Sequence, residues 1–72
     1  MYIVTELQTN GETTAVLNYT YTDKNVALQQ YHTILAAAAV SQVEVHTAMI
    51  INEIGLVEYR ESFDRRVDTQ GE

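Results

Sequence analysis

The segment from Lys24 to Val40 has the apolar period of an α-helix, yet Lys24 is its only charged side chain. A helix on the surface of a monomer normally carries a polar and usually charged outer side. The outer side here would carry Val26, Gln29, Thr33, Ala36, Ala37 and Val40. Because alanine and valine are poor solvent-facing residues, we expect another protein surface to cover them, most simply a second copy of the chain. The predicted oligomer interface is formed by Val26, Thr33, Ala36, Ala37 and Val40.

Small size gives a further reason to expect self-association. A chain of 72 residues buries only about 60 % of the surface that its unfolded form exposes, so a monomer is marginally stable. Small proteins compensate with disulfides, a metal ion or oligomerisation. The sequence has no cysteine and only two histidines, so we expect no disulfide, metal site or other cofactor. A homodimer or larger oligomer is the option that remains.

Ten acidic and four basic residues give the chain a net charge of −6. This charge disfavours direct binding to nucleic acid, because phosphates are neutralised by Lys and Arg. It is compatible with a basic protein partner, but the simpler explanation is that it keeps a small protein soluble. The longest apolar run, Ile34 to Val40, is far shorter than the roughly 20 residues of a membrane helix. Since the chain also opens without a basic signal-peptide segment and lacks cysteine, we expect a protein of the reducing cytosol.

The first part of the chain predicts a β-hairpin. Residues 2–8 and 13–21 are rich in β-branched and aromatic residues, and they flank Asn10-Gly11, a strong signal for a tight turn. A turn centred on this dipeptide would place Val4 opposite Leu17. The other face of the hairpin would carry apolar residues: Ile3, Leu7 and Val16.

The helix that follows has clear start signals and a clear buried side. Either Thr22 or Asp23 can cap it, because both side chains accept hydrogen bonds from the free amides of a first turn. The four alanines from position 36 to 39 favour helix and leave room for another backbone to approach. The buried side is predicted from i, i+3, i+4 and i+7 spacing. It consists of Ala27, Leu28, Tyr31, Ile34, Leu35 and Ala38.

A second hairpin is predicted from residues 43–51 and 56–63. The four residues between them fit a type I turn with Gly55 in the left-handed conformation. If Ile51 lies opposite Leu56, then His46 faces Glu61. From position 64 onward the sequence is polar without a period and is expected to fray. We therefore assign residues 1–63 to a single domain and residues 64–72 to a polar C-terminal tail.

Together these elements predict an α+β fold in the order ββαββ, a four-stranded antiparallel sheet with one helix on one face. Because the helix joins the second and third strands, those two run parallel, and the third strand fits antiparallel beside the first. The predicted strand order is 2-1-3-4. Both faces of this sheet carry apolar residues, whereas one helix covers only one face. We expect the second face to meet a partner.

The two histidines are the candidates for acid–base chemistry. Neither lies at a spacing from Ser, Cys or Asp that indicates a nucleophile and its base. His32 lies on the flank of the buried helical side, as a ligand contact, a pH-sensitive interface residue or a boundary residue that only packs. His46 opposite Glu61 is either a functional histidine–carboxylate pair or an ordinary cross-strand pair. We expect no catalytic residues and no enzyme activity.

Most of the positive charge lies at the end of the last predicted strand, in Arg60, Arg65 and Arg66. The topology brings this end near the helix C-terminus, where positive charge is favourable. Arginines beside aromatic rings can bind phosphate and stack on a base, but they also fit a solvated tail paired with neighbouring acidic residues. The candidate ligand-binding residues are Tyr31, His32, Tyr59, Arg60, Phe63, Arg65 and Arg66.

Several short motifs carry a resemblance to other sequences: Tyr2-Ile3-Val4, Ala27-Leu28-Gln29-Gln30-Tyr31-His32 followed by Leu35-Ala36, Ile50-Ile51-Asn52 with Gly55, and Glu61 before Phe63 and Arg65. On these motifs the chain resembles a loose group of short uncharacterised proteins from bacteriophages and mobile elements of Gram-positive bacteria. Members of that group often have Trp in place of Phe63, which weakens a stacking role there. The resemblance covers most of residues 1–66 and implies a phage or mobile-element origin, without supplying a biochemical activity.

Small oligomeric phage proteins without enzyme activity often act by stoichiometric binding. We therefore expect an antagonist of host antiviral defence in the host cytosol, which either sequesters an anionic nucleotide signal or masks a basic defence protein. The aromatic and arginine residues favour the nucleotide, whereas the net charge of −6 favours the basic protein. The alternative is a structural or regulatory phage interaction module with no small ligand.

Overall fold

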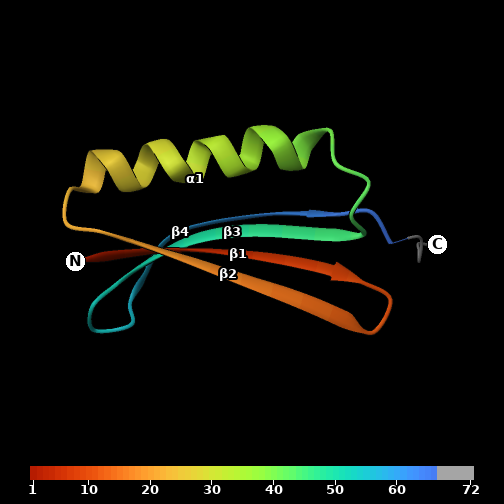
Figure 1. Ribbon diagram of the computed structural model, residues 1–72, viewed down its shortest axis with the longest axis horizontal. Coiled ribbons are helices and arrows are strands. Elements are labelled where there is room, and N and C mark those ends of the chain that lie inside the picture. Colours follow the sequence, from red (N-terminus) through yellow and green to blue (C-terminus); the bar gives the residue numbers. More distant parts are fainter. Residues whose placement is uncertain (67–72) are drawn as a thin grey trace.

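The computed structural model describes residues 1–66, which form a four-stranded antiparallel sheet with one helix across one face (Figure 1). The strands are β1 (Tyr2–Asn10), β2 (Thr13–Tyr21), β3 (Val45–Asn52) and β4 (Val57–Asp64), and the helix α1 spans Lys24–Ala39. Their order across the sheet is β2-β1-β3-β4. The predicted α+β class, the ββαββ sequence of elements and the strand order 2-1-3-4 are confirmed.

The β1–β2 hairpin turns one residue later than predicted. Asn10 pairs with Thr13, so the turn consists of Gly11 and Glu12, and Gly11 has a φ of 61°. The predicted pairing of Val4 with Leu17 is wrong, because Val4 lies opposite Tyr19. A tight hairpin turn needs φ above zero at its first central position, and glycine meets that need better than asparagine. Since side chains alternate, the two-residue shift in pairing leaves each residue on its predicted face.

The β3–β4 hairpin contains the predicted turn but also an irregularity that the sequence did not reveal. The Gly55 amide donates to the Asn52 carbonyl at 2.9 Å, and Gly55 has a φ of 85°. Next to Ile50 the register shifts, and Glu58 is bulged out of the ladder. Beyond the bulge His46 lies opposite Phe63, so the predicted pairing of His46 with Glu61 is wrong.

Helix α1 begins after Asp23, whose carboxylate accepts a hydrogen bond from the Asn25 amide at 2.8 Å. Asp23 is therefore the N-cap, which confirms one of the two predicted candidates. The predicted buried side of the helix is also confirmed. Ala27, Tyr31, Ile34 and Ala38 are buried, and Leu28 and Leu35 are partly buried.

The core lies between α1 and the two central strands. Val4 of β1 and Ile50 of β3 pair with each other, and both are 0 % exposed. Ala48 is buried beside them, and Tyr2, Tyr19 and Tyr21 pack around the same cluster. Burying a side chain such as Val or Ile stabilises the fold by about 1.5–3 kcal/mol, so this cluster holds the helix on the sheet.

The opposite face of the sheet is covered by no other element of residues 1–66 (Figure 1). Val4 and Ile50 point toward α1, so their chain neighbours point away from it. Among these, Ile3 and Ile51 pair across the central strands and are only half-buried. We call this side of the sheet the open face. The predicted excess of apolar surface is therefore present.

The chain remains attached to the fold just past the predicted domain boundary. Strand β4 extends to Asp64, and the Arg65 amide donates to the Glu44 carbonyl at 2.6 Å. Residues 67–72, the rest of the predicted tail, lie outside the described residues.

Candidate functional site

Aromatic side chains meet where α1 packs beside the edge strand β4. The Tyr31 ring lies 5.3 Å from the His32 ring and 5.8 Å from the Tyr59 ring. The Lys24 ammonium lies 5.6 Å from the centre of the Tyr59 ring and 3.4 Å from the Glu58 carboxylate. Tyr31 is buried, whereas His32 and Tyr59 are exposed. The structure thus brings together three of the predicted ligand residues and adds an ammonium group to them.

Two groups at this edge have shifted pKa values. Burial, followed by the charge of Glu61, raises the pKa of the Tyr31 phenol. The proximity of Tyr59, followed by a hydrogen bond and the charge of Glu58, raises the pKa of Lys24. At neutral pH the phenol keeps its proton and the ammonium keeps its charge. The group is therefore suited to contacts with a partner or ligand rather than to proton transfer.

The remaining predicted ligand residues do not converge on this edge. Alternation along β4 places Tyr59 and Phe63 on the side of α1, and it places Arg60 on the open face. The side chain of Arg60 makes no hydrogen bond or ion pair with any residue of the described segment 1–66. The prediction grouped these residues because they are close in sequence. In a strand, however, neighbouring residues point to opposite faces of the sheet.

Arg65 closes the C-terminal end of α1. Its Nη2 donates to the Ala38 carbonyl at 2.6 Å and to the Ala39 carbonyl at 3.0 Å. Its guanidinium also lies 5.5 Å from the Phe63 ring. Helix α1 has no basic residue in its own last turn, so Arg65 supplies the positive charge and the donors that this end lacks. The predicted proximity of the strand end to the helix C-terminus is confirmed.

Arg66 is paired with Asp64. Its Nε donates to Asp64 Oδ1 at 3.0 Å, and its Nη2 donates to Oδ2 at 2.8 Å. These hydrogen bonds from Arg66 lower the pKa of Asp64 to about 2. Lys24, Arg65 and Arg66 all bind groups of the chain itself, so an anionic ligand would have to compete with existing contacts.

A buried polar pair that the sequence did not predict joins β3 to β1. His46 Nε2 lies 2.6 Å from Glu6 Oε2, and the Gln8 amide donates to the same oxygen at 2.8 Å. The side chains of His46 and Glu6 are only 5 % and 12 % exposed. Placing the ring proton on Nε2 lets His46 donate to Glu6 and leaves Nδ1 as an acceptor. That Nδ1 is buried without a hydrogen-bond partner among residues 1–66, so it is out of reach of a substrate in solvent.

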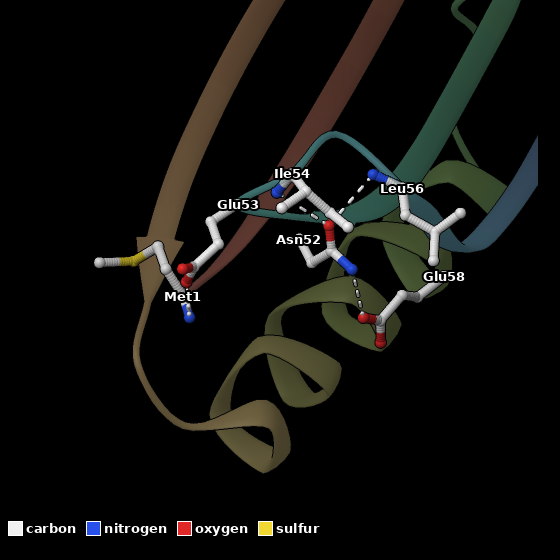
Figure 2. Close-up of polar contacts among 6 residues, drawn as sticks. All are labelled: Met1, Asn52, Glu53, Ile54, Leu56 and Glu58. Atoms are coloured by element: carbon white, nitrogen blue, oxygen red, sulfur yellow. Dashed lines mark hydrogen bonds and ion pairs between the residues drawn. The ribbon is translucent and has the colours of Figure 1, made fainter.

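A shallow pocket of about 260 Å³ lies at the end of the sheet that carries the β3–β4 turn. Its lining residues are Met1, Tyr2, Asn52, Glu53, Ile54 and Glu58. The Asn52 side chain accepts from the amides of Ile54 at 3.0 Å and Leu56 at 3.1 Å, and it donates to Glu58 at 3.2 Å (Figure 2). The Met1 amine contacts Glu53 at 2.9 Å (Figure 2). These polar groups hold the turn, and the volume is below the roughly 300–1,000 Å³ of small-molecule sites.

The predicted oligomer-interface residues are all exposed on the side of α1 that faces away from the sheet: Val26, Thr33, Ala36, Ala37 and Val40. We call this side the outer helix surface. Val26 is 42 % exposed and Val40 is 84 % exposed. The Thr33 hydroxyl donates to the Gln29 carbonyl at 2.8 Å, so its hydrogen bond is made within the helix. A partner could cover this surface without leaving that donor unpaired.

The open face is a second, mostly apolar surface. Its apolar side chains are Ile3, Leu7, Val16, Val45, Met49, Ile51 and Val57, all half-buried or exposed. The charged side chains of this face, Arg60 and Asp64, both lie on the edge strand β4. Apolar areas of this kind are typical of interaction surfaces.

Comparisons with protein-family models, with curated proteins and with solved structures find no match to this chain. Within residues 1–66, no group of three or more His, Asp or Glu side chains is arranged to hold a metal ion. No helix in that part of the chain has the length and apolar character needed to cross a membrane.

Proposed function

We propose that this chain is a non-enzymatic binding protein that acts by covering a surface of another protein. The observation that carries the proposal is the outer helix surface, where Val26 and Val40 are exposed and the side chains of α1 after Lys24 are uncharged. Small side chains at Ala36 and Ala37 allow a partner to approach the helix backbone closely. Such a surface is suited to a dry contact with another protein rather than to a small ligand.

The charge of the chain supports a basic partner. The net charge is −6, and Asp23 and Glu61 are exposed next to α1. The net negative charge of the chain attracts a basic protein during their encounter. The contact surface itself is uncharged, so no charged side chain of this chain is buried when the two bind. The resemblance to phage and mobile-element proteins supports a host antiviral defence protein as the target. On this proposal the chain is a stoichiometric antagonist in the host cytosol.

Capture of a nucleotide signal is a second candidate. The exposed rings of His32 and Tyr59 and the Lys24 ammonium near Tyr59 support it, because a base can stack there beside a positive charge. The arginines support it less, since Arg65 caps α1 and Arg66 pairs with Asp64.

The test compares variants in host cells that carry antiviral defence. Native mass spectrometry of the purified chain reads the bound species, and plaque formation by a defence-sensitive phage reads the biological effect. We expect a host protein to co-purify in a fixed ratio with the wild type, and we expect the wild type to restore plaque formation by the phage. Ala37→Arg should abolish both the co-purification and the restored plaque formation. The matched control is Gln42→Arg, which adds the same charge at an exposed position outside α1.

The other outcomes support other functions. A retained nucleotide that is lost with the double variant Lys24→Ala, Tyr59→Ala would favour nucleotide capture over masking. If no bound species is found and Ala37→Arg changes no phenotype of host or phage, the antagonist proposal is rejected. The structural or regulatory phage module then becomes the better explanation.

A further inference from the structure

Six polar side chains of the open face form three hydrogen-bonded pairs across the strands. The Thr5 hydroxyl donates to Asn18 Oδ1 at 2.8 Å, the hydroxyls of Thr9 and Thr14 lie 2.8 Å apart, and those of Thr47 and Ser62 lie 2.6 Å apart. Burial of a polar group is costly mainly when the group loses its hydrogen bond to water without a replacement. These pairs keep their bonds when the face is covered, so covering it carries little of that cost.

The apolar side chains of the open face form a band that crosses the whole sheet. Ile51 pairs with Ile3 on one side and with Val57 on the other. Met49 lies in the next cross-strand row, opposite Thr5, and Leu7 pairs with Val16 in the row after it, so the band runs diagonally to the edge strand β2. Val16 is 57 % exposed and Val57 is 49 % exposed. The two edges of the band are thus the parts that solvent reaches most.

The open face comes closer than the outer helix surface to the area that a stable dimer needs. Strands of eight or nine residues at about 3.3 Å each, four abreast at about 4.8 Å, give a projected area on the order of 500 Å² before side-chain relief is counted. A helix of 16 residues about 10 Å wide projects on the order of 250 Å². Stable interfaces bury about 800 Å² of accessible surface on each partner, which the corrugated open face approaches more closely.

The charges of the open face are complementary to themselves. Arg60 and Asp64 lie on the same strand, on the same face, with Ser62 between them. A two-fold axis in the plane of contact, perpendicular to the strands and passing over Ser62, sets each strand over its own copy in the reverse direction. Arg60 then lies beside Asp64 of the second copy. Asp64 already binds Arg66, but a carboxylate has acceptor capacity for a further donor.

We propose that two copies of this chain dimerise through their open faces, as a sandwich of two sheets with both helices outside. Face-to-face sheets pack about 10 Å apart, so Leu7 and Val16, in the same cross-strand row as Ser62, meet their own counterparts, and Met49 lies over Val45 of the second copy. The self-association surface is then the sheet, whereas the sequence predicted it on the outer helix surface. This inference goes beyond the proposed function, because it concerns the chain alone and leaves the outer helix surfaces available.

The test is the mass of the purified full chain by sedimentation equilibrium, with circular dichroism to check folding. At about 100 µM, where a dimer with a micromolar Kd is almost fully formed, we expect the wild type at twice the mass of one chain. Met49→Lys, at the middle of the open face, should give a folded monomer. The matched control Val40→Lys, which adds the same charge on the outer helix surface, should remain a dimer.

A charge exchange separates the proposed geometry from a general loss of fold. Arg60→Glu alone and Asp64→Arg alone should each raise the Kd of the dimer about tenfold or more, because like charges then meet across the interface. The double variant Arg60→Glu, Asp64→Arg should recover most of that loss. A monomeric wild type, dissociation by Val40→Lys but not by Met49→Lys, or no recovery in the double variant would each overturn the proposal. None of these outcomes bears on a host target, because no host component is present.

Discussion

The two faces of the single sheet are filled in different ways. On the side of α1, Val4 and Ile50 are fully buried and the polar groups Glu6 and His46 pair out of solvent. On the open face, the side chains are uncharged up to the edge strand, and threonine hydroxyls hydrogen-bond to polar side chains of the neighbouring strand. Ile51, one residue from Ile50, is only half-buried. The comparison shows that strand alternation supplies apolar side chains to both faces, while one helix covers only one.

The largest expected effect compares the neighbours Ile50 and Ile51. Ile50→Ala should destabilise the fold by about 2–5 kcal/mol, because it removes a fully buried side chain and leaves a cavity under α1. Ile51→Ala should cost about 1 kcal/mol, because that side chain is already half in solvent. Urea denaturation at a protein concentration low enough to keep the chain monomeric measures both. Equal losses would show that the open face is as tightly packed as the core.

The second prediction compares the polar groups of the two faces. Glu6→Ala should cost about 1–3 kcal/mol, since it leaves His46 Nε2 and the Gln8 amide without their shared acceptor in a buried place. Thr9→Ala breaks an exposed hydroxyl pair with Thr14 and should cost less than about 1 kcal/mol. Thermal unfolding by circular dichroism measures the two losses. If Thr9→Ala costs as much as Glu6→Ala, the open face carries a polar network of its own.

The third prediction concerns the turns, which set the register and therefore the residues that meet on each face. Gly11→Val and Gly55→Val should each cost about 1–2 kcal/mol, because a β-branched residue is strained at φ above zero. An added Cβ would meet no atom within 4 Å at either position, so the loss comes from the backbone alone. Gly11→Asn and Gly55→Asn are the controls and should cost less. If both valine variants had the same Tm as the wild type, the turns would differ from those described.

The smallest effect is expected at the edge of the open face, from the pH dependence of Asp64. Its pKa is lowered from 3.8 to about 2 in the folded chain, so the folded state binds this proton more weakly than the unfolded state. The stabilisation is complete above the ordinary pKa and is lost as the pH falls toward 2. It should be small and sensitive to salt, because Asp64 and Arg66 are both exposed. The Tm difference between wild type and Asp64→Asn should therefore shrink from neutral pH to pH 2, and a constant difference would contradict it.

Local patterns in the sequence were sufficient to predict the elements and their order. The period of α1 gave its buried side, and the connection through α1 gave the order β2-β1-β3-β4. The registers were wrong because each depends on a detail of one or two residues. The first depends on whether Asn10 or Gly11 opens the turn, and the second depends on a bulge at Glu58. Neither detail has a periodic signal in the sequence.

The candidate site was harder to predict, because its residues are related in space rather than along the chain. Arg60 and Tyr59 are neighbours in sequence but lie on different faces of β4. Glu6 and His46 are 40 positions apart, and only the pairing of β1 with β3 brings them together. A signal was present in the alternation of β1, which puts Glu6 on the same face as the apolar Val4. The partner of such a buried carboxylate could not be read from β1 alone.

The central position of β1 in the sheet has a consequence for synthesis of the chain. Its hairpin with β2 is local and can form early, whereas its pairing with β3 waits until the second half of the chain exists. Distant pairing of this kind slows folding relative to a bundle of helices. Until β3 arrives, one edge of β1 has unpaired amides and carbonyls, and such edges recruit other strands. Aggregation of unfinished chains is therefore expected along the edge of β1, at right angles to the contact that finished chains make through the open face.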